Sequence, residues 1–216
     1  MRVVDCEQNT PLWHATRAGK CTGSRIADVT AKGKNGAPSA MRATYLGELV
    51  AERLSGSQPM DGFMSAAMKW GRDQEEVACA SYAIMYDAEP TKVGFVLHPT
   101  LDDAGASPDR IVGERGCMQV KCPNTICQID WLLGGSIEGK YIKQMQWEML
   151  CAEREWCDFV GFDPRLPPEL QLYVKRIPRD DKMIADLERE VKIFLNDVSE
   201  TVEKLRKLYL PQEIAA

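Results

Sequence analysis

The sequence predicts a single α/β (α+β) domain in which a central mixed sheet is flanked by helices. Three observations support this prediction: helical patterns fill the first part of the chain, short strand-like segments follow, and a long amphipathic helix ends it. A chain of 216 residues is long enough for one domain with a sizeable core. We therefore expect one domain over residues 1–216, with N-terminal helices and a basic loop (1–64), a core (65–180) and a C-terminal helix (181–216).

The first part of the chain contains residues that typically start and end short helices. Thr10 followed by Pro11 is a typical helix start, and Gly19 is a typical stop after Ala18. The remaining helical predictions are a short helix over 22–29, a helix over 40–54 with regularly spaced apolar residues, and a long helix over about 65–85. Between them we expect a flexible basic loop at 31–39 and a second loop at 55–63.

From about residue 91 the pattern changes to short segments bounded by turn residues, which is typical of strands. The expected strands cover 91–97, 104–107, 110–113, 117–121, 156–162 and 170–177, and Glu114-Arg-Gly is a good hairpin turn between the third and the fourth. Two helices are expected over 126–133 and 141–152. The last segment, from Asp180 to about Tyr209, carries an apolar stripe at helical spacing from Ile184 to Val198.

Composition and charge exclude few functions. Hydrophobic residues make up 44% of the chain and charged residues 27%, which is ordinary for a globular protein. No run of eighteen apolar residues exists and the N-terminus lacks an apolar signal core, so we expect no membrane span and an intracellular protein. The net charge of −5 argues against nucleic-acid binding, but residues 1–44 carry seven Lys/Arg against three Asp/Glu. Such a locally basic region could still bind phosphates.

The eight cysteines are best read as free thiols. Disulfides are improbable in an intracellular protein of this length. A metal cluster favours close pairs such as C-x-x-C, and the sequence has none. We therefore expect the cysteines to be small buried apolar side chains.

Candidate catalytic residues lie on the two arms of the predicted hairpin. Asp109 opens one arm, whereas Gln119 and Lys121 are two residues apart on the other arm and therefore face the same side. An acid, a second oxygen ligand and a lysine could thus converge at one point. Oxygen ligands can hold Mg²⁺, the metal can activate water, and a lysine can steady the developing charge, which together would hydrolyse a phosphodiester. By spacing alone the pattern is common, because most such lysines are solvated and most such aspartates lie in turns.

Several blocks around this pattern resemble a known family. Ser107-Pro-Asp-Arg with Met118-Gln-Val-Lys-Cys-Pro resembles the core of phage lambda exonuclease and the YqaJ-type viral recombinase nucleases, which belong to the PD-(D/E)XK superfamily. Three more blocks resemble the family in the same order, and the late Tyr173-Val-Lys-Arg fits its final strand. These blocks are Trp13-His-Ala-Thr-Arg-Ala-Gly with Thr22-Gly-Ser-Arg, Trp70-Gly-Arg-Asp-Gln-Glu, and Tyr141-Ile-Lys-Gln-Met-Gln. The resemblance covers roughly residues 10–180 and implies a PD-(D/E)XK nuclease core.

The resemblance implies a role for each matching residue. The implied catalytic residues are Glu75, Asp109, Gln119, Lys121 and Gln146, with Gln144 as the alternative to Gln146. The implied metal site holds two Mg²⁺ or Mn²⁺ ions on Glu75, Asp109, Gln119 and the backbone carbonyl of Val120. The implied 5′-phosphate pocket consists of Arg17, Ser24 and Ser107, whose guanidinium and hydroxyl groups suit a phosphate. Met68 is expected to act as a wedge at the terminal base pair, and Lys32 and Lys34 are expected to contact DNA.

The alternatives to these roles are structural. Arg17 could be a surface charge, Ser24 could only cap a helix, and Met68 could be a core methionine.

Gln119 departs from the family pattern, which has Glu at this place. Glutamine is nearly isosteric but uncharged, so we expect greatly reduced or absent cleavage with DNA binding largely kept. Either natural divergence or an engineered Glu→Gln change would explain it, and the intact neighbouring motifs favour the engineered change.

The resemblance also implies the substrate and the partners. We expect a processive 5′-to-3′ exonuclease that acts on the ends of linear double-stranded DNA and leaves a 3′ overhang for recombination by strand annealing. A homotrimeric ring, a single-strand annealing recombinase as partner, and the cytoplasm of a bacterial host of a phage or prophage complete the expectation. The alternatives are a non-catalytic DNA-end-binding subunit, a repair endonuclease of the same superfamily, and a structural protein with chance motifs.

Overall fold

The computed structural model describes residues 1–34, 36–57 and 65–209, with the side chains of Ala67 and Met68 excepted. Within this part the helices are α1 (Pro11–Arg17), α2 (Ile26–Val29), α3 (Ala40–Ser55), α4 (Ala66–Tyr86), α5 (Thr125–Leu132), α6 (Gly139–Ala152) and α7 (Asp181–Tyr209). Two 3₁₀ helices, η1 (Gly23–Arg25) and η2 (Pro168–Leu170), accompany them. None of the described helices is both long and apolar enough to cross a membrane.

The strands form two mixed sheets rather than the one that we expected. The four-stranded sheet has the order β1-β4-β5-β2 and consists of β1 (Arg2–Val4), β4 (Phe95–Leu97), β5 (Ala104–Ala106) and β2 (Cys21–Thr22). The five-stranded sheet has the order β3-β6-β7-β8-β9 and consists of β3 (Pro90–Thr91), β6 (Arg110–Val112), β7 (Gly116–Lys121), β8 (Trp156–Phe162) and β9 (Leu172–Pro178). The α/β class with helices flanking mixed sheets is confirmed.

Alternation along β7 and β8 sends their side chains to opposite faces of the five-stranded sheet. Met118 and Val120 join a core cluster with Ala78 and Tyr82 of α4, so α4 covers one face. Cys117 of the same strand joins the residues of α5 and α6 in another cluster, so these helices cover the other face. The polar Gln119 has the parity of Cys117 and therefore lies on the face that α6 covers.

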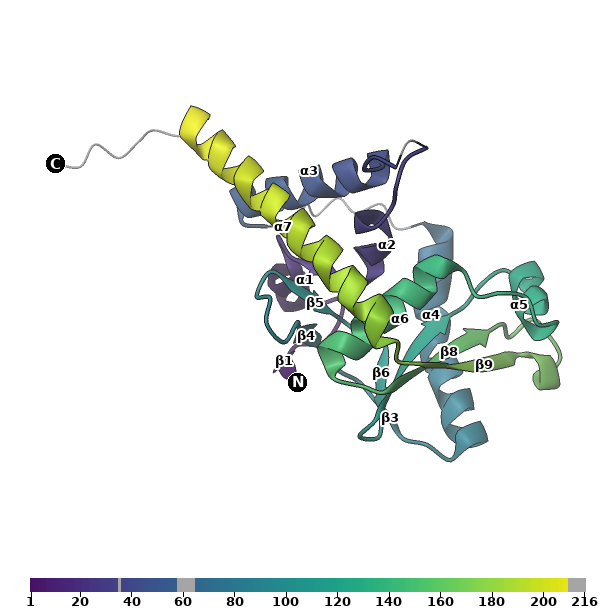
Figure 1. Cartoon of the computed structure of the whole chain (residues 1–216). Helices are drawn as coiled ribbons and strands as arrows, with labels where there is room; N and C mark the ends of the chain where they lie inside the picture. The colour runs from purple at the N-terminus through teal and green to yellow at the C-terminus, as the bar shows by residue number, and fades with distance from the viewer. Residues whose placement is uncertain (35, 58–64, 210–216) are drawn as a thin grey trace.

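The four-stranded sheet packs in a third core with α2, α3, α6 and α7. In Figure 1, α7 runs as the long yellow helix across the molecule beside α3, and α6 lies between α7 and the five-stranded sheet. The buried stripe of α7 includes Ile184, Leu187, Val191 and Val198, as its periodicity predicted. Because α6 contacts both sheets, it connects the two halves of the domain.

The helix boundaries largely follow their sequence signals. The Thr10 side chain accepts a hydrogen bond from the N–H of Trp13, Pro11 is the first residue of α1, and Gly19 has a φ of +70°. Ser39 caps α3 in the same way through the N–H of Arg42. Thr22, in contrast, accepts no capping bond, because it belongs to strand β2.

One strand prediction, for 91–97, was wrong, and β1 and β2 were not predicted. The segment 91–97, expected as one strand, contributes its ends to different sheets: Thr91 pairs with Ile111, and Val96 pairs with Val3 and Ala106. Gly94 lies at this change of sheet, where an added Cβ would come within 2.4 Å of the Val4 carbonyl oxygen. Strand β1 was not expected, because three residues at a chain start show too little alternation to be recognised.

All eight cysteines are free thiols, and Cys21, Cys79, Cys117, Cys151 and Cys157 are buried. The interpretation as apolar side chains is thereby confirmed for most of them.

Candidate active site

A cavity of about 790 Å³ lies between α1, η1, the start of α4, the end of β7 and one face of α6. Polar side chains from distant parts of the sequence converge on it. Among them are most of the predicted site residues: Arg17, Ser24, Glu75, Ser107, Asp109, Gln119, Val120 and Lys121.

Asp109 stands at the centre of the predicted motif. Its Oδ2 accepts hydrogen bonds from the backbone N–H of Val120, at 2.6 Å, and from Nε2 of Gln119, at 2.5 Å. Arg110 pairs with Met118 across the hairpin, so the strand register brings Asp109 beside the end of β7. The expected convergence of Asp109 and Gln119 is present.

The carboxyl group of Asp109 is partly desolvated. Burial is the main cause that raises the pKa of Asp109 to about 6, and the charge of Glu75 adds to it. Lys121, the N–H of Val120 and Arg110 act in the opposite direction. A neighbouring cation would stabilise the anion of such a carboxyl group.

Glu75 reaches the cavity from α4, and Arg110 fixes its direction. One arm of the Arg110 guanidinium donates to Glu75 Oε1 at 2.8 Å and the other to Glu76 Oε1 at 2.8 Å. Arg110 itself is buried, and its Nη1 also donates to the carbonyl of Asp109. This arginine therefore ties the acid of α4 to the strand that follows Asp109.

Two glutamines extend the polar row from Asp109 towards α6. Oε1 of Gln119 accepts from Nε2 of Gln144 at 2.7 Å, and the same nitrogen donates to Oε1 of Glu148 at 2.8 Å. Carboxylates can only accept hydrogen bonds when ionised. With Asp109 at one end of the row and Glu148 at the other, both amides have their NH₂ groups directed at a carboxylate.

Glu148 is a carboxyl group that the sequence analysis missed. It is 1% exposed, lines the cavity, and its Oε2 has no hydrogen-bond partner among the described residues. Burial is the main cause that raises its pKa well above the ordinary value; Asp109 raises the pKa further, whereas Gln144 and Lys121 lower it. Its spacing of four residues from Gln144 places both on one face of α6, which was the available signal.

The position predicted for Gln146 was wrong, because this residue does not line the cavity. Its side chain donates to the carbonyl of Pro178 and accepts from the N–H of Asp180, so it connects α6 to the junction between β9 and α7. Two residues along a helix point to nearly opposite sides. Gln144, the alternative in the Tyr141-x-x-Gln-x-Gln motif, is the glutamine in the site.

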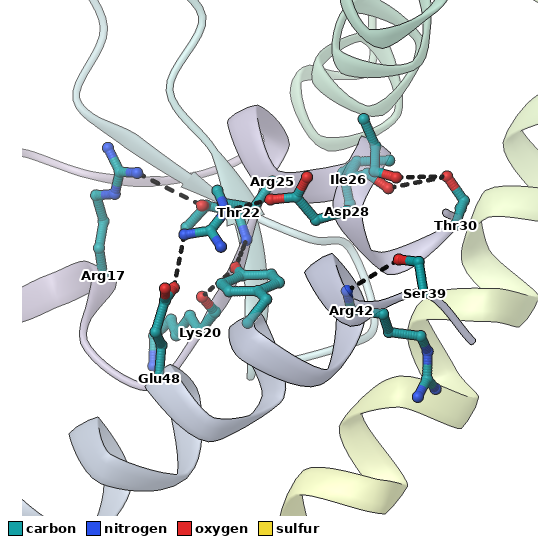
Figure 2. A network of polar contacts seen from close by, with 12 residues as sticks. Arg17, Lys20, Thr22, Arg25, Ile26, Asp28, Thr30, Ser39, Arg42 and Glu48 are labelled. Carbon is teal, nitrogen blue, oxygen red and sulfur yellow. Dashed lines mark hydrogen bonds and ion pairs between the residues drawn. The ribbon is translucent and has the colours of Figure 1, made fainter. Parts of the chain in front are cut away.

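Arg17 and Ser107 form a polar corner of the cavity. The Arg17 guanidinium lies 3.8 Å from the centre of the Trp13 ring, and the Trp13 Nε1–H donates to Ser107 Oγ at 2.9 Å. Figure 2 shows Arg17 extending from α1 towards Thr22, whose hydroxyl accepts a hydrogen bond from Nη2. Burial lowers the pKa of Arg17 to about 10, and its Nε is buried without a hydrogen-bond partner in the described part of the chain. A partly desolvated guanidinium with an open donor favours an anionic ligand.

The other predicted contacts lie outside this arrangement. Ser24 is exposed in η1 at the rim of the cavity, whereas Lys32 and Lys34 lie exposed in the loop before α3 and do not line it. The prediction for Met68 concerns a side chain outside the described residues. Lys121 lines the cavity with its ammonium 5.1 Å from the centre of the Tyr141 ring.

One aromatic and one basic residue, Trp70 and Arg165, also line the cavity. The Arg165 guanidinium lies 5.1 Å from the centre of the Trp70 ring, and both residues line the cavity. Trp70 was part of a recognised motif, but Arg165 lies in a loop without a motif and gave no signal.

The donor atoms of the cavity decide whether it suits a metal ion. Within residues 1–34, 36–57 and 65–209, no three Asp, Glu, His or Cys side chains are close enough together to hold a metal ion. Beside Asp109, position 119 carries an amide rather than a carboxylate. The oxygen-rich set with a buried, unpartnered carboxylate oxygen on Glu148 nevertheless fits a hard divalent cation.

Comparisons with known proteins agree with this architecture. The crystal structure of the alkaline exonuclease LHK-Exo from Laribacter hongkongensis is 43% identical in sequence with a TM-score of 0.85, covering 92% of this chain and 97% of that one. A second structure of LHK-Exo, in complex with dAMP, gives the same values. A phage-related exonuclease from Haemophilus somnus, 15% identical with a TM-score of 0.64, covers 86% of this chain and 96% of its own and shares the fold.

No match was found among curated proteins. A sequence model of the YqaJ-like viral recombinase domain matches residues 12–155. The chain therefore belongs to the family of YqaJ-like viral recombinase domains, as the ordered motifs predicted.

Proposed function

We propose that this protein is a metal-dependent nuclease that digests one strand of linear double-stranded DNA from the 5′ end and leaves a 3′ overhang. One observation carries the proposal: a single cavity contains both the Asp109–Gln119–Lys121 group and the partly desolvated guanidinium of Arg17. The first can hydrolyse a phosphodiester, and the second can hold a terminal phosphate. The similarity to an alkaline exonuclease crystallised with a nucleoside monophosphate supports the same chemistry.

Mg²⁺ or Mn²⁺ would be held by the oxygens of Asp109, Glu75 and Gln119 and by the carbonyl of Val120, with two ions per site. When bound, the metal would polarise the scissile phosphate and lower the pKa of its water. Lys121, whose charge lowers the pKa of Asp109, would steady the charge that develops on the phosphate. Arg17, Ser24 and Ser107 hold the 5′-phosphate, and so fix which phosphodiester lies at the acids.

The experiment is digestion of linear duplex DNA labelled at either end, in Mg²⁺, with and without a 5′-phosphate. We expect 5′-to-3′ loss of one strand and faster digestion of the phosphorylated duplex. Equal rates on 5′-hydroxyl and 5′-phosphate ends would contradict the phosphate pocket. Cleavage of closed circular DNA would indicate the repair endonuclease instead.

Gln119 lowers the expected rate. Its NH₂ faces Asp109 at 2.5 Å, so it presents hydrogen atoms where a cation needs oxygen. The chain as it stands should bind DNA ends better than it cuts them, whether the glutamine arose naturally or by design. Gln119→Glu should raise the cleavage rate by about tenfold or more, the scale of losses when a metal site is weakened.

A second candidate, the non-catalytic DNA-end-binding subunit, is favoured by the same glutamine. It predicts tight binding of duplex ends and no cleavage even by the Gln119→Glu variant. The cleavage assay on that variant therefore separates the two functions.

We propose further that three copies assemble into a ring around the duplex, with Met68 as the wedge at the terminal base pair and a single-strand annealing protein as the partner. Enclosure would keep an acidic protein on DNA without a strongly basic surface. Sedimentation equilibrium should give three times the monomer mass, and a monomeric mass would contradict the ring. Met68→Ala should lower processivity.

A further inference from the structure

Glu148 is a buried acid that the proposed chemistry leaves without a role. Its carboxyl group lines the active-site cavity at 1% exposure, and Oε2 lacks a hydrogen-bond partner in the described residues. Burying a carboxylate costs free energy unless hydrogen bonds or a cation compensate it. Since only one of its oxygens accepts a bond, from Gln144, the compensation within the protein is incomplete.

The direction of the side chain adds a second observation. The Nε2 of Gln144 contacts both Oε1 of Glu148 and Oε1 of Gln119, so the carboxylate and the amide of β7 are separated by one nitrogen. On its other side, Gln119 contacts Asp109. The four side chains form one row from the central acid of the hairpin to the buried acid of α6.

The aliphatic part of the Glu148 side chain also lies beside the polar corner of Arg17 and Ser107. Its Cγ is one of the atoms that a Cβ at Gly23 would contact, at 3.6 Å, and Gly23 lies between Thr22 and Ser24 at the cavity wall. Glu148 therefore stands between the metal-binding acids and the segment that faces Arg17.

We propose that Glu148 is a metal-holding carboxylate of this site, supplied by α6 in compensation for the carboxylate that β7 lacks at Gln119. The inference rests on the proposed metal-dependent function and deepens it. A divalent cation beside Asp109 would compete with the amide of Gln144 for the Glu148 oxygens and would add to the positive charge that Lys121 provides. Glu75, Asp109 and Glu148 then provide three carboxylates, the same charge as a set made of Glu75, Asp109 and a Glu at position 119.

The test is Mn²⁺ binding to the full chain without DNA, measured by calorimetry and by the loss of the free-ion paramagnetic resonance signal. Glu148→Gln should weaken Mn²⁺ binding by about tenfold or more. The double variant Q119E/E148Q, which moves the carboxylate back to β7, should restore it to near the parent value. Glu138→Gln is the matched control, because Glu138 is exposed at the start of the same helix and does not line the cavity.

Unchanged Mn²⁺ affinity in Glu148→Gln would overturn the proposal. Loss of affinity without restoration in the double variant would overturn it too, because the acid would then act through the fold rather than as a ligand. Restoration itself shows that Gln at position 148 permits folding. Digestion of duplex DNA by the double variant, assayed in parallel, tests the nuclease separately: a variant that binds Mn²⁺ and does not cut contradicts the function and leaves the role of Glu148 intact.

Discussion

At the scale of single residues, the main property of the site is that burial disfavours the charged forms of its ionisable groups. Asp109 and Glu148 are acids whose pKa values burial raises, and Arg17 is a cation whose pKa burial lowers. Each of these groups is therefore less stable as an ion in the bare protein than it would be in water. The divalent cation and the phosphate that we propose as ligands would each remove that penalty.

The raised pKa of Asp109 predicts how stability depends on pH in the metal-free protein. Its folded value of about 6 exceeds the ordinary 3.8, so the stability linked to this group is fully present below about pH 4 and is lost as pH rises to about 6. In EDTA, the free energy of unfolding of the parent minus that of Asp109→Asn should fall over this window, by on the order of 1–3 kcal/mol. Urea unfolding of both proteins at several pH values measures the difference. A difference that rises with pH would mean that the folded pKa is lowered.

The stacking of the Arg17 guanidinium on Trp13 predicts that a positive charge alone is not enough to bind a 5′-phosphate in the polar corner. Arg17→Lys keeps the charge but loses the stacking on Trp13 and the second donor arm. We expect the preference for a 5′-phosphate over a 5′-hydroxyl end to fall by about tenfold or more, as for loss of a hydrogen bond between charged groups. Digestion of the 5′-hydroxyl duplex serves as the internal control, since its rate should change little. An unchanged preference would remove Arg17 from the pocket.

The sequence predicted the residues of the hairpin better than those of the helix. The period of two along a strand brought Gln119 and Lys121 to one side, and the turn brought Asp109 to them. On α6, the motif offered two glutamines, and only the geometry of a helix distinguishes their faces. Glu148 follows from Gln144 once that choice is made, because four residues complete about one turn.

At the scale of elements, the loop before α3 carries exposed positive charge. Lys32 and Lys34 are exposed, and Lys32 forms an isolated bridge with Pro38 that closes the loop on itself. Neither lysine lines the cavity, so the role that we propose for them towards DNA is contact with backbone phosphates or with the minor groove. Such contacts make binding depend on salt.

The double variant K32A/K34A should therefore weaken the binding of duplex ends without changing the preference for a 5′-phosphate. If each lysine neutralises one phosphate, the slope of log K against log salt should become shallower by about 2. Fluorescence anisotropy at several NaCl concentrations measures the slope. Lys182, a residue at the start of α7 outside the cavity and the loop, gives a matched control as Lys182→Ala. An unchanged slope in K32A/K34A would show that the loop does not face DNA.

Elements with their own local signal could be predicted, whereas elements defined by distant partners could not. Helices α1 and α3 have capping residues and a glycine or serine at the boundary, and their positions were correct to about one residue. Strand β1 exists because Val3 pairs with Val96, and the segment after Pro90 is divided because its two ends pair with different strands. Pairing partners far along the chain leave no local pattern.

At the scale of the whole molecule, α7 packs against α3, which in turn contacts a residue of the candidate active site. Phe194 of α7 is fully buried and stacks on Tyr45 of α3, with ring centres 5.3 Å apart. The hydroxyl of Tyr45 accepts a hydrogen bond from the N–H of Thr22, the residue whose side chain binds Arg17. Direct contacts thus connect the core of α7 to the polar corner, and Figure 2 shows the last of them, between Thr22 and Arg17.

This line of contacts predicts that a core substitution in α7 is felt both in stability and at the site. Phe194→Ala removes a fully buried ring and should lower the free energy of unfolding by about 3–5 kcal/mol. Ile193→Ala, at the neighbouring residue of the same helix, is the matched control: Ile193 is 50% exposed, so the change should stay within about 0.5 kcal/mol plus the small difference in helix propensity. Urea unfolding gives both values.

Where Phe194→Ala remains folded, the loosened Tyr45 should also reduce the preference for a 5′-phosphate, because Thr22 and Arg17 lose their support. Ile193→Ala should leave that preference unchanged. Equal losses of stability in the two variants would mean that α7 does not pack through the face that its periodicity and its buried stripe assign to the core.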